Sequence, residues 1–269
     1  MSATFPPRTP AMTDAGLRTT RDGDVCTVTI HRPDKLNALS RPVLGALGEA
    51  FAGAAADPTL KCMVIRGAGD RYFAAGGDLV DLADVRSESE TIGMVEQCRT
   101  ALDAVRDCPV PVIALLNGDA IGGGAELAVA CDFRLICDHA HLGFIHGRMA
   151  ITSAWGGGTD LIDLCGASRA LRMMVRAELV TAQTAWQWGL ADVVVTTATA
   201  DAALARFVEP MLGQSALALR ACKAQVIAFR HGLSREERRA VESRSLVGTW
   251  RSEDHWSAVE RFLAGERRN

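Results

Sequence analysis

The chain has 269 residues, of which 48% are hydrophobic and 23% are charged, and its 29 basic and 32 acidic residues give a net charge of -3. This length and composition indicate a substantial core, organised as one medium-large domain with an appendage. The chain lacks the excess of positive charge that would indicate a nucleic-acid partner. It also lacks the basic helical face that would indicate binding to a membrane surface, so we expect neither partner.

The eight cysteines are expected to be reduced. Most of them lie inside apolar runs, where a thiol behaves as a small hydrophobe. No pair has CxxC spacing, and no Cys/His cluster has the spacing of zinc ligands. This pattern predicts structural thiols, no metal site and a cytoplasmic protein.

Residues 1–20 are rich in Pro, Thr and Ala and contain no apolar segment of the kind found in signal peptides. They are predicted to form a disordered lead-in. Further along, no apolar run approaches the ~18–20 residues of a membrane span.

Short apolar strands alternate with helices from residue 25 to residue 137. Residues 25–31 alternate β-branched and polar side chains, which predicts a half-buried strand. A helix is expected from the cap Ser40 to about Asp57, with Pro42 in its first turn. The other expected elements are strands at 62–66, 112–116 and 133–137 and helices at 90–107 and 125–130. This alternation predicts an α/β fold with buried, largely parallel strands.

Helical patterns dominate after Trp155. Thr181 is expected to cap a helix that stops at Gly189. From about residue 200 the helical patterns carry many charges, which indicates a region that packs on the core or on a partner subunit. We therefore divide the chain into the lead-in, a core at 21–200 and a C-terminal helical region at 201–269.

Two glycine-rich segments follow buried strands: residues 73–78 (FAAGGD) and residues 117–126 (NGDAIGGGAE). The second precedes an apolar helix, whose N-terminus offers unpaired N–H groups to a ligand. Taken alone it is better explained as a tight strand-to-helix turn, and neither GxxxxGK[ST] nor GxGxxG is present to indicate a nucleotide loop. Two bends at the ends of adjacent strands can aim two N–H donors at one oxygen, which is the geometry of an oxyanion hole.

Four motifs in order resemble the crotonase (enoyl-CoA hydratase/isomerase) superfamily: HRPDKLNALS, FAAGGDL, NGDAIGGGAELAVACDFRL and WQWGLADVVV. The resemblance implies an α/β, crotonase-like ββα spiral core with a C-terminal helical region. It also implies a homotrimer or dimer of trimers and an acyl-CoA substrate, with coenzyme A entering as part of the substrate and no cofactor bound permanently. By position, the oxyanion donors would be the N–H groups of Ala74 and Gly123.

Glu126 and His146 are the candidate catalytic residues. Glu126 follows Gly123 by one helical turn, where a carboxyl group would face the α- and β-carbons of a bound thioester. A stabilising N-terminal glutamate is the other interpretation of this position. Hydratases of the superfamily use a second glutamate, and its position falls on His146. Histidine suits acid–base work near neutral pH, although a structural role is common too.

The segments FIHGRMAITSAWGGGTDL and ESRSLVGTW are similar to those of the ethylmalonyl-CoA decarboxylase branch of the superfamily. The favoured hypothesis is therefore decarboxylation of a methylmalonyl- or ethylmalonyl-type thioester. This chemistry favours a protonated Glu126, because two carboxylates repel. The alternatives are an enoyl-CoA hydratase or isomerase in which His146 replaces the second glutamate, and a non-catalytic subunit that binds acyl-CoA.

The remaining candidates concern substrate binding. Lys35 lies in the turn that approaches coenzyme A in this superfamily, so it is a candidate for a phosphate contact. Phe144, Met149 and Trp155 are candidate pocket walls, and are as readily explained as core residues. Asp78 is predicted to hold its bend by accepting backbone N–H bonds, and Arg148 to face a carboxylate or to form a surface ion pair. The glycine-rich backbone is expected to lie against the substrate at Ala75, Gly76, Gly77 and Gly122.

Overall fold

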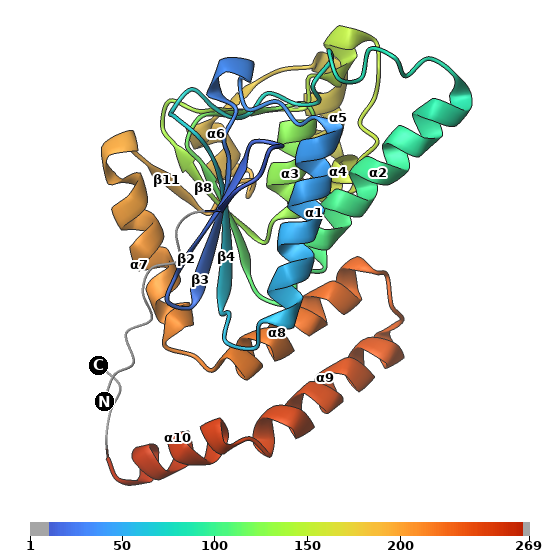
Figure 1. The fold of residues 1–269 in the computed structure, drawn as a ribbon. Helices are drawn as coiled ribbons and strands as arrows, with labels where there is room; N and C mark the ends of the chain where they lie inside the picture. The colour runs from blue at the N-terminus through green and yellow to red at the C-terminus, as the bar shows by residue number, and fades with distance from the viewer. Residues whose placement is uncertain (1–10, 266–269) are drawn as a thin grey trace.

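The apolar strands predicted from the sequence lie side by side in the computed structural model, which describes residues 11–265 (Figure 1). Within these residues one sheet has seven strands in the order β1, β2, β3, β4, β6, β8 and β11. Neighbours from β3 onward are parallel, and β1 and β2 form an antiparallel edge. The bounds are β1 Ala11–Met12, β2 Leu17–Asp22, β3 Val25–Ile30, β4 Cys62–Gly67, β6 Val112–Leu116, β8 Phe133–Cys137 and β11 Val193–Val195.

In the same described part of the chain, a second sheet has four strands in the order β10, β9, β7 and β5. Three successive units each give one strand to each sheet, as the pairs β4 and β5, β6 and β7, and β8 and β9. This repetition is the ββα spiral that the resemblance implied, so the predicted fold class is confirmed. The small sheet consists of β5 Tyr72–Ala74, β7 Asp119–Ile121, β9 His141–Gly143 and β10 Val180–Thr181.

Helices cover both faces of the large sheet. Helix α1 (Arg41–Ala56) lies on one side and α7 (Ala200–Leu212) on the other, with α2 (Glu88–Arg106) packed against α1 (Figure 1). Strands covered on both faces are expected to be apolar throughout, which is why β6 has no polar side chain and every residue of it is buried. Ser40 occupies the N-cap of α1 as predicted, although its side chain makes no capping hydrogen bond.

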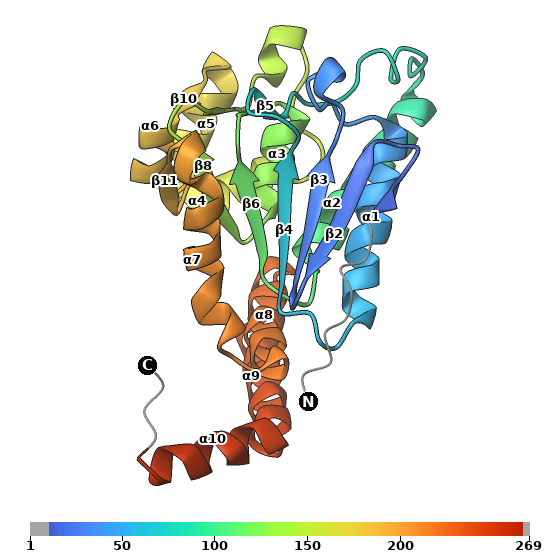
Figure 2. The same ribbon diagram turned by 60° about the vertical axis from the view of Figure 1, so that its left-hand side comes forward.

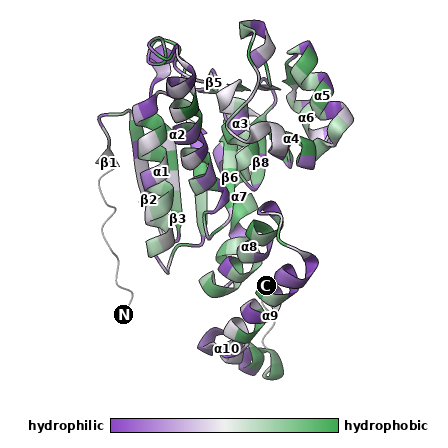
Figure 3. Ribbon diagram, turned by 90° about the vertical axis from the view of Figure 1, so that its right-hand side faces the viewer, coloured by the Kyte–Doolittle hydropathy of each residue, from purple (hydrophilic) through white to green (hydrophobic). Residues whose placement is uncertain are grey.

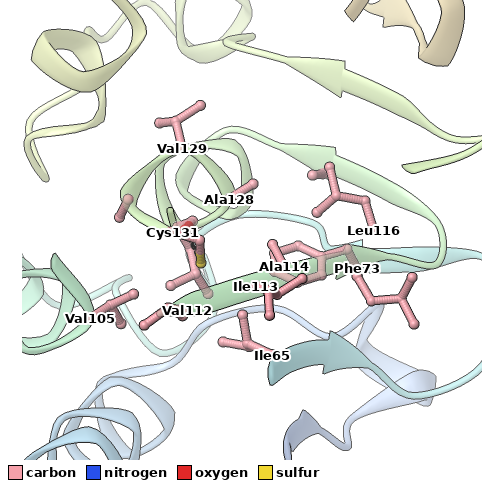
Figure 4. Close-up of a cluster of buried hydrophobic side chains, with 14 of the residues drawn as sticks. Ile65, Phe73, Val105, Val112, Ile113, Ala114, Leu116, Ala128, Val129 and Cys131 are labelled. Atoms are coloured by element: carbon pink, nitrogen blue, oxygen red, sulfur yellow. Dashed lines mark hydrogen bonds between the residues drawn. The ribbon is translucent and has the colours of Figure 1, made fainter. Parts of the chain in front are cut away.

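The core between the large sheet and the short helix α3 (Gly123–Ala130) is built from aliphatic side chains and one aromatic ring (Figure 4). Ile65 and Phe73 lie beside β6 in the same buried cluster as Ile113 and Leu116, and Val105 lies near Val112 (Figure 4). Full burial of one such side chain stabilises the fold by roughly 1.5–3 kcal/mol. This packing fixes the start of α3, where the second glycine-rich segment ends.

Shorter elements lie between the strands and the long helices. They are the helices α4 Gly157–Cys165, α5 Ala167–Arg176 and α6 Ala182–Gln187, and the 3-10 turns η1 Pro33–Lys35, η2 His146–Met149 and η3 Thr197–Thr199. Thr181 caps α6 through a hydrogen bond from the N–H of Thr184, as predicted.

The last helices, α8 (Ala216–Arg230), α9 (Arg235–Trp250) and α10 (Glu253–Leu263), lie beyond one end of the large sheet (Figures 1 and 2). Helix α8 is held to the core by Lys223, whose Nζ lies 2.6 Å from Asp132 Oδ1. By contrast, α9 and α10 contain no buried residue, and hydrophobic and hydrophilic residues are mixed along them (Figure 3). Residues 201–265 contain helices and turns.

The predicted lead-in is wrong over residues 11–20, while residues 1–10 lie outside the described part of the chain. Strand β1 pairs with β2, and β2 pairs along its whole length with β3. The cause is the turn between β2 and β3, where Gly23 has a φ of 52° directly after Asp22. Asp22 pairs with Val25, so the loop is the two-residue Gly23-Asp24 turn. A Gly-Asp loop between two strands is a hairpin signal, and it makes residues 17–30 one antiparallel unit.

All eight cysteines are free, in agreement with the sequence. None of the helices in residues 11–265 is long and apolar enough to cross a membrane.

Candidate active site

The two glycine-rich segments face each other across the ends of β5 and β7. A Cβ atom added at Gly76, which has a φ of 97°, would lie 3.3 Å from the nitrogen of Gly123. A Cβ atom added at Gly124 would overlap the carbonyl oxygen of Ala74. Only glycine allows this backbone-to-backbone approach. The structure therefore brings the two predicted segments into contact.

Gly123 is suited to donate to a ligand. It is the first residue of α3, and the N–H groups of Ala125 and Glu126 both bond the carbonyl oxygen of the cap residue Gly122. The N–H of a first helical residue has no acceptor within its helix. The predicted position of this donor, at a helix start beside the other segment, is what the structure shows.

The second donor is better assigned to Gly77 than to Ala74. Gly77 forms a parallel bridge with Leu39 in which Leu39 binds the carbonyl oxygen of Gly76 and the N–H of Asp78. This pattern turns the N–H of Gly77 away from Leu39. Ala74 is instead part of β5, paired with β7.

The indole of Trp155 links the two glycines. A Cβ atom added at Gly77 would lie 3.5 Å from its Cη2, and one added at Gly123 would overlap the same ring. Sequence reasoning placed Gly77 only among the substrate contacts, because FAAGGD does not reveal which of its residues pairs with Leu39. Trp155 is 7% exposed, so its ring is a wall over both glycines.

Glu126 and His146 meet, as predicted for a catalytic pair. Glu126 is only 1% exposed, and its Oε2 accepts the N–H groups of Trp155 at 2.9 Å and Gly157 at 3.0 Å. Its Oε1 lies 3.1 Å from Nε2 of His146. Because Oε2 is occupied by two backbone N–H groups, Oε1 is the carboxyl oxygen that faces the imidazole.

His146 comes from η2 and is backed by a buried aromatic ring. The centroids of Phe144 and His146 lie 5.8 Å apart with an interplanar angle of 49°. Phe144 is fully buried, so it supports the histidine from behind. Met149 is 58% exposed and lines no enclosed wall.

Lys35 lies at the end of η1 and is exposed. The next residues, Leu36 and Asn37, have φ values of 55° and 54°. The carbonyl oxygen of Leu36 accepts the N–H of Ala75 at 3.2 Å, so this turn lies against the first glycine-rich segment.

Asn37 was not identified from the sequence. Its buried side chain donates to the carbonyl oxygens of Tyr72 at 2.7 Å and Ala68 at 3.0 Å, and accepts the N–H of Arg32. These bonds hold the strained turn beside β5. The only sequence signal is that Asn tolerates a left-handed φ better than most residues do.

Asp78 holds the bend after FAAGG, as predicted. Its Oδ1 accepts the N–H of Val80 at 3.2 Å, and its Oδ2 accepts a hydrogen bond from Arg32 at 2.8 Å. Burial acts to raise the pKa of Asp78, but the bonds from Arg32 and from the N–H groups of Asp81 and Val80 together hold that pKa below its usual value.

The surroundings of two further side chains, Arg148 and Cys98, give them no reactive role. Arg148 donates from Nε to the carbonyl oxygen of Ala177 at 2.9 Å and forms no ion pair within the described residues. Burial, and secondly the negative charge of Glu126, raise the pKa of Cys98 to about 12, so that thiol stays protonated.

Comparison with known proteins agrees with this geometry. The family model described as enoyl-CoA hydratase/isomerase matches residues 20–269. A crotonyl-CoA hydratase of Syntrophomonas wolfei is 28% identical over 252 residues, which cover 93% of this chain and 95% of that protein. An ethylmalonyl-CoA decarboxylase of Xenopus laevis is 30% identical over 175 residues, 65% of this chain and 58% of that protein.

Among solved structures, an enoyl-CoA hydratase/carnithine racemase from Magnetospirillum magneticum superposes with a TM-score of 0.88 at 28% identity. The match covers 97% of this chain and 96% of that one. The chain therefore belongs to the enoyl-CoA hydratase/isomerase family of the crotonase superfamily, whose members act on acyl-CoA thioesters.

Proposed function

We propose that this enzyme decarboxylates an alkylmalonyl-CoA of the methylmalonyl or ethylmalonyl type. The observation that carries the proposal is the pair formed by Glu126 and His146 at 3.1 Å, where a hydratase would place two carboxylates. A substrate that itself bears a carboxylate is repelled less by an imidazole than by a second glutamate. The similarity to an ethylmalonyl-CoA decarboxylase supports the same choice.

In the proposed reaction the thioester oxygen binds the N–H of Gly123 and a second N–H from the first segment. Gly77 is favoured by geometry and Ala74 by the resemblance. The bond between the α-carbon and the carboxylate breaks, its electron pair forms the enolate, and carbon dioxide leaves. Each donor is expected to contribute roughly 3–4 kcal/mol to stabilising the enolate oxygen.

The enolate is then protonated at its α-carbon. The pair formed by Glu126 and His146 donates this proton, and it takes up another proton from water afterwards. The buried carboxyl of Glu126 and the wall made by Trp155 keep this step in a region of low solvent access. Such a region strengthens the electrostatic stabilisation of the enolate.

Hydration or isomerisation of an enoyl-CoA is the second candidate. It is favoured by the likeness to a crotonyl-CoA hydratase over 93% of this chain. In that case Glu126 and His146 would hold the attacking water between them or move a proton along the acyl chain. A non-catalytic acyl-CoA-binding subunit is a third hypothesis, which the close catalytic pair and the glycine contacts argue against.

The proposal includes the binding mode and the assembly. Coenzyme A enters as part of the substrate, with its phosphates near Lys35, and no permanently bound cofactor is required. A homotrimer or dimer of trimers would cover the apolar side chains exposed on α9 and α10, among them Leu246, Val247 and Phe262. Free, mostly buried cysteines support a cytoplasmic location.

The function is tested by incubating the protein separately with ethylmalonyl-CoA, methylmalonyl-CoA and crotonyl-CoA and identifying the products by mass spectrometry. We expect butyryl-CoA or propionyl-CoA to form with release of carbon dioxide. Fast hydration of crotonyl-CoA without loss of carbon dioxide from either malonyl ester would overturn the proposal in favour of the second candidate. Inactivity on all three would favour the binding subunit.

A further inference from the structure

A buried arginine at the end of α2 contacts the loop that holds Glu126. Arg106 is 9% exposed. Its Nε and one terminal nitrogen donate to Oδ2 of Asp160 at 2.9 and 2.7 Å. The same terminal nitrogen donates to the carbonyl oxygen of Trp155 at 3.1 Å, and the other binds Asp103 at 2.8 Å.

The contacts of Arg106 surround the two amides that bind the catalytic carboxyl. Trp155 donates its N–H to Glu126 and accepts Arg106 at its C=O. Gly157, whose N–H also binds Glu126, is the first residue of α4, and Asp160 lies in the first turn of that helix. Gly156, between Trp155 and Gly157, has a φ of 92°, and a Cβ atom added there would lie 2.8 Å from the guanidinium of Arg106.

The guanidinium therefore fixes one loop by hydrogen bonds at two places within six residues, Trp155 and Asp160, and leaves no room for a side chain at Gly156 between them. The loop carries both amide donors to Glu126 and the indole that covers Gly77 and Gly123. Displacement of the loop would move the carboxyl and the wall of the site together.

We infer that Arg106 is a positioning residue of the active site, acting through the backbone of Trp155 and Gly157 on Glu126. It touches neither of the proposed reacting groups. The inference rests on the proposed function only in assuming that Glu126 exchanges a proton with the substrate, whichever reaction follows.

The expected effect is on turnover more than on substrate binding. A misplacement of about 1 Å in a catalytic group can cost on the order of 100-fold in rate. For Arg106→Gln we expect kcat to fall roughly 100-fold, while the Kd for butyryl-CoA changes less than about 3-fold. Arg106→Lys keeps the charge but not the planar fork, so we expect it to recover only part of the loss.

Arg99 provides a matched control. It lies on the same helix and donates from Nε to the carbonyl oxygen of Ala154 at 2.8 Å, next to Trp155, but it is exposed to water. Arg99→Gln should therefore leave kcat near that of the wild type. Asp160→Asn keeps Arg106 in place but weakens its hydrogen bonds to α4, and we expect it to lower kcat as well. It serves as the test if Arg106→Gln does not fold.

Two readouts separate this inference from the proposed function. One is turnover of whichever thioester the wild type consumes, and the other is exchange of the α-protons of butyryl-CoA in heavy water, followed by mass spectrometry. If the wild type exchanges α-protons without releasing carbon dioxide from a malonyl ester, the proposed reaction fails and the inference is still tested. A variant Arg106→Gln with a lowered melting temperature but unchanged kcat and exchange would overturn it. So would an equal loss in Arg99→Gln, or a wild type that exchanges no proton.

Discussion

The active site and the C-terminal helices are stabilised in different ways. At the site, each oxygen of the Glu126 carboxyl has a partner, and glycines allow the backbone segments to touch. Helices α9 and α10 contain no buried residue and expose large apolar side chains such as Trp250 and Phe262. Contacts within one chain therefore hold the Glu126 carboxyl, whereas the apolar side chains of α9 and α10 stay exposed in it.

This difference separates two kinds of sensitivity. A substitution in the site changes the geometry of groups that are already in contact, so its effect should appear in turnover. A substitution where α8 joins the core should change how the C-terminal helices are held, so its effect should appear in stability. The predictions below test that separation.

The largest effect is expected for Glu126→Gln. The amide cannot exchange a proton with an enolate, and general acid–base catalysis contributes about 10²–10⁴-fold to rates. We expect kcat to fall roughly 1000-fold, measured on the preferred thioester by product formation. A kcat within a factor of ten of the wild type would remove Glu126 from the chemistry.

The next largest effect is expected for Lys223→Met. Lys223 is 4% exposed and pairs with Asp132, so its replacement leaves that buried carboxylate with only Arg230 and the N–H of Val112. Removing one partner of a buried ion pair costs on the order of 3–5 kcal/mol, and we expect the lower end because two partners remain. Urea unfolding measures the loss.

A surface pair provides the control for Lys223. Arg66 lies 2.6 Å from Asp201, whose side chain is 79% exposed. Arg66→Met should cost no more than about 1 kcal/mol, as for other exposed pairs. If the two variants lose equal unfolding free energy, the pair of Lys223 and Asp132 stabilises the protein no more than an exposed ion pair does.

For His146→Ala we expect turnover to fall roughly 100-fold, near the low end for loss of an acid–base group. Binding of butyryl-CoA should change little, because the glycine-rich segments and Trp155 remain. Titration of the variant with butyryl-CoA beside a kcat measurement checks both parts. An unchanged kcat would assign His146 a structural role.

The sequence predicted features that depend on local chain chemistry. The apolar runs of β4, β6 and β8 and the cap at Thr181 were placed to within about two residues because strand and cap signals are local. The glycine-rich segments could be recognised as a facing pair because each follows a buried strand. The strand in residues 17–22 was missed because the hairpin turn at Gly23-Asp24 was not weighed.

Contacts that span long stretches of chain could not be predicted. Arg106 reaches the carbonyl oxygen of Trp155 across 49 residues, and nothing in the residues around either one signals the contact. Gly77 became the favoured donor only through its bridge to Leu39, which depends on how η1 and the following turn lie against β5. The contact between Glu126 and His146 could be anticipated because the resemblance supplied both positions.

The smallest expected effect is a change in how stability depends on pH, in Asp78→Asn. The folded-state pKa of Asp78 lies below its ordinary value of 3.8, so its ionised form stabilises the native state. This contribution is fully present above the unfolded-state pKa and is lost as the pH falls through the folded-state value. The difference in unfolding free energy between wild type and variant should therefore be constant near neutral pH and shrink below about pH 4.

Urea unfolding at several pH values between neutrality and strong acid measures that difference. Asp163→Asn, at an exposed position, controls for the loss of one negative charge. A gap for Asp78→Asn that stays constant into acid would mean that the bond from Arg32 does not stabilise the bend through charge. The N–H of Val80 would then be the contact that holds the bend, because an asparagine oxygen still accepts that bond.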